Sequence, residues 1–382
     1  MAIIGAGNGG QSAAFQLSQK GLTIHLCDVD VKIVEGIKDR GGIHASGKLE
    51  GFTRIPLVTT QLGEAVEGVE AILPMVPRYA HRGIAENLLP YLKKKQRILL
   101  CPGSTTGELE FARVLRENGR DSPVSTVATL PYASRLQGPG DVFISLVAKT
   151  LFFATFPGRR TKEEAEYFQD FFGGITPVTN ALEVGLNNGN PITHPAPTLL
   201  NTARIERRDE FLFYREGISP AIANINQQLD KERLTLCRGL GFREIPLTER
   251  LFLTGYTDRI YDSPLEAYHQ SKAFASIPAP NSLQHRYITE DIPYGLVTFA
   301  SLGEYLGIST PTIDLMIELA HLIFGIDFWT NGMTLSKLGL NRMGSADLNR
   351  FMEEGESPFV DWSRIPLLAS RKSSPDEFGK GG

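Results

Sequence analysis

Short apolar runs alternate with amphipathic stretches along the first half of the chain. The apolar runs are rich in strand-forming residues, and in the stretches between them apolar residues recur at helical spacing. Alternation of this kind predicts a doubly wound α/β domain, in which helices cover a mostly parallel sheet. The expected strands are 2–4, 22–27, 71–76, 97–101, 123–129 and 151–156, and the expected helices include 11–20, 30–40, 82–92 and 109–118.

Helical spacing replaces the alternation after about residue 180. The expected helices begin at proline-containing turns, and two of them end at a glycine; they cover 196–204, 219–240 and 310–324. The stretch 243–286 has no clear period and is expected to be irregular, and the polar tail from Glu353 is expected to be frayed. We therefore expect an α/β domain over residues 1–180, followed by an all-α domain over residues 181–382.

A glycine-rich turn follows the first apolar run. Gly5, Gly7 and Gly10 are spaced as Gly-x-Gly-x-x-Gly, with Asn8 and Gly9 inside the turn. The first glycine permits a tight turn, the second lets the backbone approach a diphosphate, and the third lets the helix pack closely. Because a strand precedes the turn and a helix follows it, the motif predicts a dinucleotide-binding domain of the Rossmann type.

One acid sets the expected cofactor preference. Asp28 ends the second strand, 28 − 10 = 18 residues after the last glycine, where a carboxylate can accept hydrogen bonds from both ribose hydroxyls. Asp30 adds negative charge, and no arginine directly follows Asp28 to receive a 2′-phosphate. We therefore expect NAD rather than NADP. Only residues 1–4 precede the turn, which is short for a central strand, so we expect a few N-terminal residues to be missing.

Two further loops end expected strands at the same edge of the sheet. One is Pro-Met-Val-Pro at 74–77, and the other is Pro-Gly-Ser-Thr-Thr-Gly at 102–107. Ligands of such sheets bind at the carboxyl ends of the strands, so we expect Pro77 and Gly103 to face the cofactor. Ordinary turn chemistry is the alternative interpretation for each loop.

Composition limits the classes of partner. A net charge of −4 gives no general attraction for nucleic acid or an anionic membrane, and no apolar run is long enough to suggest a membrane span. The three cysteines, Cys27, Cys101 and Cys237, are widely spaced and suit a reducing compartment. No histidine pair has metal-ligand spacing, so we expect no metal. We expect a cytoplasmic protein.

Two polar segments of the helical half carry candidate chemistry. His194 stands before an expected helix, whose dipole disfavours a cationic imidazole; Asp291 would offset this effect and fix the tautomer. Arg286 is suited to clamp a carboxylate through its planar fork. The structural alternatives are a boundary histidine for His194, and an ion pair of Arg286 with Glu290 or Asp291.

Several motifs occur in order over residues 1–340. They are Gly7-Asn8-Gly9-Gly10, Pro102-Gly103, Leu109-Glu110-Phe111, 116–119, 194–201, Arg286-Tyr287 with Glu290-Asp291, 295–297, Thr310-Pro311 and 334–340. In these motifs the chain resembles the opine dehydrogenases of the octopine/nopaline type, and in particular the bacterial enzymes that act on N-(1-carboxyethyl)amino acids. The resemblance does not extend clearly over 253–285, which leaves the identity of the amino acid open.

The resemblance implies roles for three residues. The histidine of the family's His-Pro motif is a proton donor and acceptor, which corresponds to His194, and the aspartate that pairs with it corresponds to Asp291. The arginine that binds the carboxylate of the 2-oxo acid corresponds to Arg286. The implied reaction is the NADH-dependent reductive condensation of an L-amino acid with a 2-oxo acid, with pyruvate expected, and its reverse. The substrates lie between the two domains, and a homodimer is one option for assembly.

Two other functions remain open. An NAD-dependent 2-hydroxy-acid or alcohol dehydrogenase of the same two-domain fold would use the same three residues. A non-catalytic NAD-sensing protein would bind the cofactor without turnover. An opine dehydrogenase would consume NADH only when pyruvate and an amino acid are both present, which would distinguish it from these two alternatives.

Overall fold

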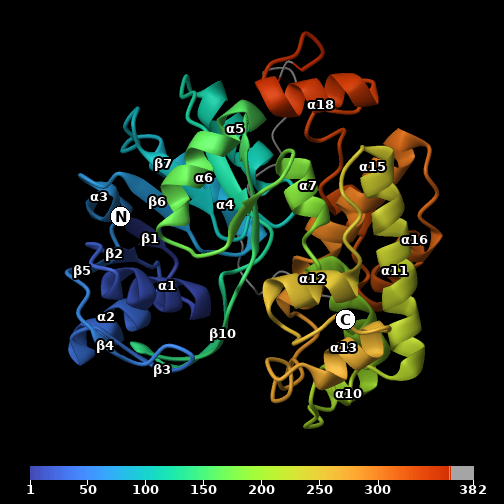
Figure 1. The fold of residues 1–382 in the computed structure, drawn as a ribbon, viewed down its shortest axis with the longest axis horizontal. Coiled ribbons are helices and arrows are strands. Elements are labelled where there is room, and N and C mark those ends of the chain that lie inside the picture. The colour runs from blue at the N-terminus through green and yellow to red at the C-terminus, as the bar shows by residue number, and fades with distance from the viewer. Residues whose placement is uncertain (361, 363–382) are drawn as a thin grey trace.

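The computed structural model describes residues 1–360 and 362. An α/β unit, blue to green in Figure 1, lies beside a helical unit in yellow and orange. The strands are β1 (Ala2–Ile4), β2 (His25–Cys27), β3 (Ile43–Gly47), β4 (Gly51–Thr53), β5 (Leu57–Thr59), β6 (Ala71–Pro74), β7 (Arg97–Leu100), β8 (Val124–Val127), β9 (Tyr132–Gly138), β10 (Asp141–Val147), β11 (Leu151–Phe156) and β12 (Ile175–Pro177).

Helices cover the sheet of the first unit and build the second. The first unit contains α1 (Asn8–Gln19), α2 (Val31–Arg40), α3 (Leu62–Val66), η1 (Arg78–Ala80), α4 (His81–Leu88), α5 (Gly107–Glu117), η2 (Gly158–Arg160) and α6 (Thr161–Gln169). The later part contains α7 (Ala181–Leu186), α8 (Asn190–Thr193), α9 (Pro195–Leu200), α10 (Thr202–Glu206), α11 (Pro220–Gly239), α12 (Leu247–Thr254), α13 (Pro264–Gln270), α14 (Arg286–Thr289), η3 (Ile292–Leu296), α15 (Val297–Leu306), α16 (Pro311–Phe324), α17 (Phe328–Asn331) and α18 (Ser345–Glu354).

The main sheet has eight strands in the order β12-β11-β8-β7-β6-β1-β2-β5. All neighbouring pairs are parallel except β11 with β8, which is antiparallel. The chain winds outward from β1 through β2 to β5, and then returns to β6 and winds the other way. The reversal between β1 and β6 is the switch point where such sheets bind ligands. The predicted Rossmann-type class is confirmed, and the turn after β1 and the loop after β6 flank this point.

A second sheet of four strands, β4-β3-β10-β9, was not predicted. Its strands pack against α1, as the contacts of that helix with β3, β9 and β10 show. The hairpin between β9 and β10 turns at Gly138-Pro139-Gly140, a turn signal that could have revealed it. This sheet matters for the site because β9 closes over the start of α1.

The helical half agrees with the expected pattern in its long helices and differs in its short ones. On α16 an apolar stripe faces the core, with Ile313, Met316 and Ile317 almost fully enclosed. The helix expected over 196–204 is instead two, α9 and α10, which meet at Asn201. The stretch 243–286 is not irregular throughout, because it contains α12 and α13. Both are short, so their apolar residues give too few repeats for a clear period.

The end of the described chain returns to the first unit. Helix α18 lies against η2, and Trp362 packs on Phe156 with ring centroids 6.1 Å apart. Most of the tail that we expected to be frayed lies outside the described residues. Among the described helices, none combines the length and apolarity that a membrane span needs.

Candidate active site

The glycine turn leaves open space where a diphosphate would lie. Gly5 has φ +103°, a left-handed conformation that favours glycine, and a Cβ on Gly10 would lie 1.8 Å from the carbonyl oxygen of Gly5. By contrast, a Cβ on Gly7 would meet nothing within 4 Å. No side chain caps the first turn of α1, so its N–H groups remain available to an anion. The turn therefore fits a dinucleotide.

Two of the predicted cofactor residues also hold the turn together. The Asp28 carboxylate accepts hydrogen bonds from the Ala6 N–H (2.6 Å) and the Asp30 N–H (2.9 Å), which places it directly beside the turn. Asn8 uses its side-chain oxygen to accept a hydrogen bond from the Leu136 N–H of β9 (2.8 Å). The Asn8 side chain therefore joins the second sheet to α1, a contact that the sequence motif did not indicate.

The two predicted loops lie at the carboxyl ends of β6 and β7. Pro77 precedes η1, and a Cβ on Gly103 would lie 1.8 Å from Thr126 Oγ1, so this position admits only glycine without movement. Arg78, fully buried, donates hydrogen bonds to Glu110 and to the carbonyls of Thr105 and Thr106. This buried arginine ties the first loop to the second.

His194 stands between two short helices, α8 and α9, where Pro195 starts the second helix. Its Nδ1 lies 2.7 Å from Asp291 Oδ2, and both side chains are buried. Its Nε2 lies 3.0 Å from the Tyr214 hydroxyl, and Tyr287 stacks on the ring at 3.9 Å between centroids. Asp291 directly precedes the π-helical turn η3. The structure thus brings together the two residues that the sequence analysis paired.

Burial governs the charge of this pair. It lowers the pKa of His194 well below its ordinary value, and the nearby Arg286 charge acts in the same direction. Burial also raises the pKa of Asp291 well above its ordinary value. We had expected Asp291 to offset such a shift in His194, but desolvation dominates. Both shifts favour the neutral forms of the two side chains, since burial disfavours charge.

Arg286 pairs with Glu290, and this ion pair reaches across to the first unit. Arg286 Nε donates to Glu290 Oε2 (3.0 Å), while Glu290 Oε1 accepts from the Ser104 hydroxyl (2.8 Å) of the second loop. Burial alone would lower the pKa of Arg286, but the Glu290 and Asp291 carboxylates raise it. No hydrogen bond involves the terminal nitrogens of Arg286 within the described chain. Its side chain is 34% exposed, so its outer edge can meet an anion.

Sequence reasoning missed several members of this site. Tyr214 and Tyr287 contact His194, and Ser104 connects the two units through its hydrogen bond to Glu290. Tyr287 lies inside a motif that we had singled out for other residues, whereas the Arg286–Glu290 ion pair is the structural alternative already named for that arginine. Tyr214 carries no local signal, since only the tertiary fold brings it to the imidazole.

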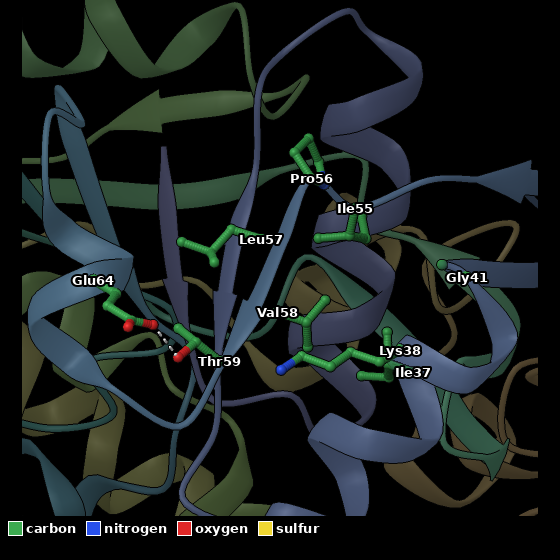
Figure 2. A pocket seen from close by; sticks show the side chains of 10 residues that line it. Ile37, Lys38, Gly41, Ile55, Pro56, Leu57, Val58, Thr59 and Glu64 are labelled. Carbon is green, nitrogen blue, oxygen red and sulfur yellow. Dashed lines mark hydrogen bonds between the residues drawn. The ribbon is translucent and has the colours of Figure 1, made fainter.

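A pocket of about 280 Å³ lies elsewhere, at the outer edge of β5 (Figure 2). Ile37 and Lys38 of α2 form one side of it, and the Thr59 hydroxyl donates to Glu64 (2.7 Å) on the other. It contains none of the predicted site residues. Among the described residues no group of three or more histidine, cysteine, aspartate or glutamate side chains could hold a metal ion.

Family models match both halves of the chain. Residues 177–324 match the alpha-helical domain of NAD/NADP octopine/nopaline dehydrogenase, and residues 1–120 match the N-terminus of NAD-dependent glycerol-3-phosphate dehydrogenase. Among curated relatives, an opine dehydrogenase of Arthrobacter sp. (strain 1C) is 33% identical over 357 residues. The match covers 92% of this chain and 98% of that protein.

Solved structures show the same fold at lower identity. Octopine dehydrogenase with NADH and L-arginine superposes with a TM-score of 0.72 at 20% identity, covering 93% of this chain and 98% of that chain. The same enzyme with NADH and pyruvate gives 0.68 at 19% identity, with coverage of 89% and 95%. Yersinopine dehydrogenase with NADP+ gives 0.67 at 15% identity, with coverage of 92% and 97%.

Proposed function

The chain belongs to the opine dehydrogenase family, and on that premise we propose that it condenses an L-amino acid with a 2-oxo acid, pyruvate first, using NADH, and catalyses the reverse oxidation. It is an NAD(P)-dependent oxidoreductase that acts on a CH–NH group. The observation that carries the proposal is the buried 2.7 Å contact between His194 and Asp291, beside the partly free guanidinium of Arg286.

The cofactor fits the glycine turn. Gly5, Gly7 and Gly10 would leave room for the diphosphate, and the first N–H groups of α1 would bind it. When bound, the reduced nicotinamide supplies the hydride. Pro77 and Gly103 would contact the cofactor from the two loops at the switch point. The Ser104 hydroxyl of the second loop donates to Glu290, the partner of Arg286. This hydrogen bond would fix the position of the cofactor loop relative to the arginine that binds the substrate.

His194 would move the proton of the reaction. The amine attacks the keto carbon, water leaves to give a protonated imine, and the carbon of that imine receives the hydride to give a secondary amine with two carboxylates. The departing oxygen needs a proton as the imine forms. Because Asp291 occupies Nδ1, the proton leaves and enters at Nε2, the atom now in contact with the Tyr214 hydroxyl. Asp291 fixes the orientation of the ring and stabilises its cationic form.

Arg286 would orient the carboxylate of the 2-oxo acid. The Glu290 carboxylate holds one edge of the guanidinium, which leaves the terminal nitrogens to bind two carboxylate oxygens. Such a clamp places the keto carbon at a fixed distance from His194, which is catalysis by positioning. The diphosphate of the cofactor is the other anion that this arginine could bind. The KM of the 2-oxo acid and the dissociation constant for NADH, measured for Arg286→Lys, distinguish the two anions.

We propose NAD as the preferred cofactor. Asp28 lies at the turn with both oxygens engaged by backbone N–H groups, and each oxygen keeps a lone pair for a ribose hydroxyl. A 2′-phosphate in the same place would meet the charges of Asp28 and Asp30. The relatives include proteins solved with NADH and with NADP+, so kcat/KM must be measured for both cofactors.

The test is an amino-acid panel with pyruvate and NADH, followed by the loss of NADH absorbance. We expect oxidation only when pyruvate and a suitable amino acid are both present. Oxidation with pyruvate alone would indicate a 2-hydroxy-acid dehydrogenase. Binding of NADH without turnover across the panel would indicate a sensing protein.

A further inference from the structure

One buried cation of the helical unit has no partner. Arg250 lies on α12 and is 6% exposed, and its Nε has no hydrogen bond. Within the described part of the chain, its guanidinium makes no hydrogen bond or ion pair at all. Burial lowers the pKa of Arg250. A buried charge without a counterion is costly, so its presence calls for an anion that joins it.

The carboxylate whose charge acts on Arg250 is already engaged elsewhere. Asp230 accepts both Arg233 Nη2 (2.6 Å) and Arg233 Nε (2.9 Å) with one oxygen, and the Leu247 N–H (2.7 Å) with the other. Asp230 is therefore the counterion of Arg233, and no carboxylate of the described residues pairs with Arg250. Simple structural pairing does not account for Arg250.

Arg250 lies against the segment that carries His194. A Cβ on Gly189 would lie 2.1 Å from Arg250 Nη2, so only a glycine at this position leaves room for the guanidinium. Gly189 precedes α8, and His194 follows that helix directly. The Arg250 charge is among those that lower the pKa of His194, after the larger effect of burial. Arg250 is thus close enough for its charge to be felt at the imidazole.

An aromatic wall leads from the Arg250 side to His194. Tyr256, which also senses the Arg250 charge, stacks on Phe274 with centroids 4.8 Å apart. Phe274 stacks on Tyr214 at 4.0 Å, and the Tyr214 hydroxyl contacts His194 Nε2. The Arg250 charge acts on Tyr256 at one end of this wall, and His194 and Tyr287 lie at the other end, next to Arg286.

We infer that Arg250 binds the carboxylate of the amino-acid substrate and is the residue that selects an amino acid over the amine that lacks this carboxylate. The inference rests on the proposed function, in which the product has two carboxylates and Arg286 binds the one from the 2-oxo acid. The second carboxylate requires a second cation on the other side of the reacting nitrogen. Ordered water bridging Arg250 to the unpartnered oxygens of Asn187 and Asn226 is the competing occupant.

The test compares amino acids with the amines that lack only the carboxylate. We would assay the full chain with pyruvate and NADH on three pairs: L-alanine and ethylamine, L-phenylalanine and 2-phenylethylamine, and L-arginine and agmatine. Discrimination is the ratio of kcat/KM within a pair. A buried charge-assisted contact predicts that the wild type prefers the amino acid by about 10–100-fold.

Arg250→Met should reduce this ratio to near one, and Arg250→Lys should leave an intermediate ratio because it keeps the charge without the fork. The control is Arg238→Met, which removes an exposed arginine paired with Glu244 and should leave the ratio unchanged. The ratio of the two kcat/KM values does not depend on the fraction of active enzyme. It can therefore be measured even if part of the variant protein is unfolded.

Three results overturn the inference. In the first, the wild type has the same kcat/KM for the amino acid and the amine of every pair it uses. In the second, Arg250→Met lowers kcat/KM equally for the amino acid and the amine of a pair, as bridging water or a structural role requires. Alternatively, Arg250→Met raises the KM of pyruvate and preserves the ratio. In each of these cases NADH oxidation still requires pyruvate and an amine, so the proposed function stands. If no amino acid supports oxidation, the proposed function fails and the inference fails with it.

Discussion

The two parts of this site are built in opposite ways. The cofactor turn comes from contiguous residues, with Gly5, Gly7 and Gly10 setting its backbone and only Asp28 arriving from the next strand. The proton-transfer centre comes from distant segments: His194 and Asp291 are 97 residues apart, and Ser104 and Glu290 are 186 residues apart. A turn of the first kind depends on local sterics. A centre of the second kind depends on tertiary packing, within the helical unit for His194 and Asp291 and between the two units for Ser104 and Glu290, so each part should respond to different substitutions.

The largest effect should come from the assembled centre. His194→Ala should lower kcat by about 10²–10⁴-fold, because it removes a positioned proton donor and acceptor. Asp291→Asn should also lower kcat strongly, since the ring would lose its orienting carboxylate. Steady-state kinetics with saturating NADH, pyruvate and amino acid measures both.

The double variant tests whether the pair acts as one unit. His194→Ala with Asp291→Asn should be little worse than His194→Ala alone, since groups that act together are not additive. If the two losses multiply, the residues act independently and the pairing has no catalytic meaning.

The cofactor turn should distinguish two of its glycines. Gly10→Ala places a methyl group 1.8 Å from the Gly5 carbonyl oxygen, so the backbone must shift at a cost of about 1–3 kcal/mol in the free energy of unfolding. Gly7→Ala meets nothing in the protein and should leave stability within about 1 kcal/mol, yet it should weaken NADH binding by crowding the diphosphate. Chemical denaturation and NADH titration of the two variants check this. Equal losses of stability in Gly10→Ala and Gly7→Ala would show that the close approach of Gly10 to the Gly5 carbonyl oxygen does not determine the turn.

Arg286 should affect the substrate side more than the cofactor side. Arg286→Lys keeps the charge and loses the planar fork, so the KM of the 2-oxo acid should rise by about tenfold. The dissociation constant for NADH is the control and should change little. A rise in that constant with an unchanged KM would assign the arginine to the cofactor diphosphate instead.

The smallest effect concerns cofactor choice. Asp28→Ala should narrow the preference for NADH over NADPH to within about tenfold, because the repulsion of a 2′-phosphate is lost. Asp30→Ala is the comparison: it should narrow the preference less than Asp28→Ala and should also lower stability, because the Asp30 carboxylate accepts the Lys32 N–H (2.8 Å) at the start of α2. Equal kcat/KM for the two cofactors in the wild type would contradict the assignment.

The same contrast explains what the sequence could reveal. Glycine spacing and strand–helix alternation are local, so the Rossmann-type sheet, its central strands and the turn were predictable. The pairing of His194 with Asp291 was anticipated through family motifs, since no local pattern connects positions so far apart. Tyr214 and Arg250 were not found, because an isolated tyrosine or arginine has no signal until the fold buries it. The strand at 151–156 was predicted, but its antiparallel direction depends on tertiary pairing with β8, and the β9–β10 hairpin was overlooked although its turn carries a local signal.

The most direct test of the account is the identity of the product that receives the hydride. The enzyme would be supplied with pyruvate, an amino acid that supports oxidation, and NADH deuterated at the transferred hydride, and the products would be analysed by mass spectrometry. We predict a secondary amine whose mass is that of the two substrates less one water plus one hydrogen and one deuterium, with the deuterium on the former keto carbon. Deuterium recovered in lactate, with the amino acid unchanged, would contradict the account.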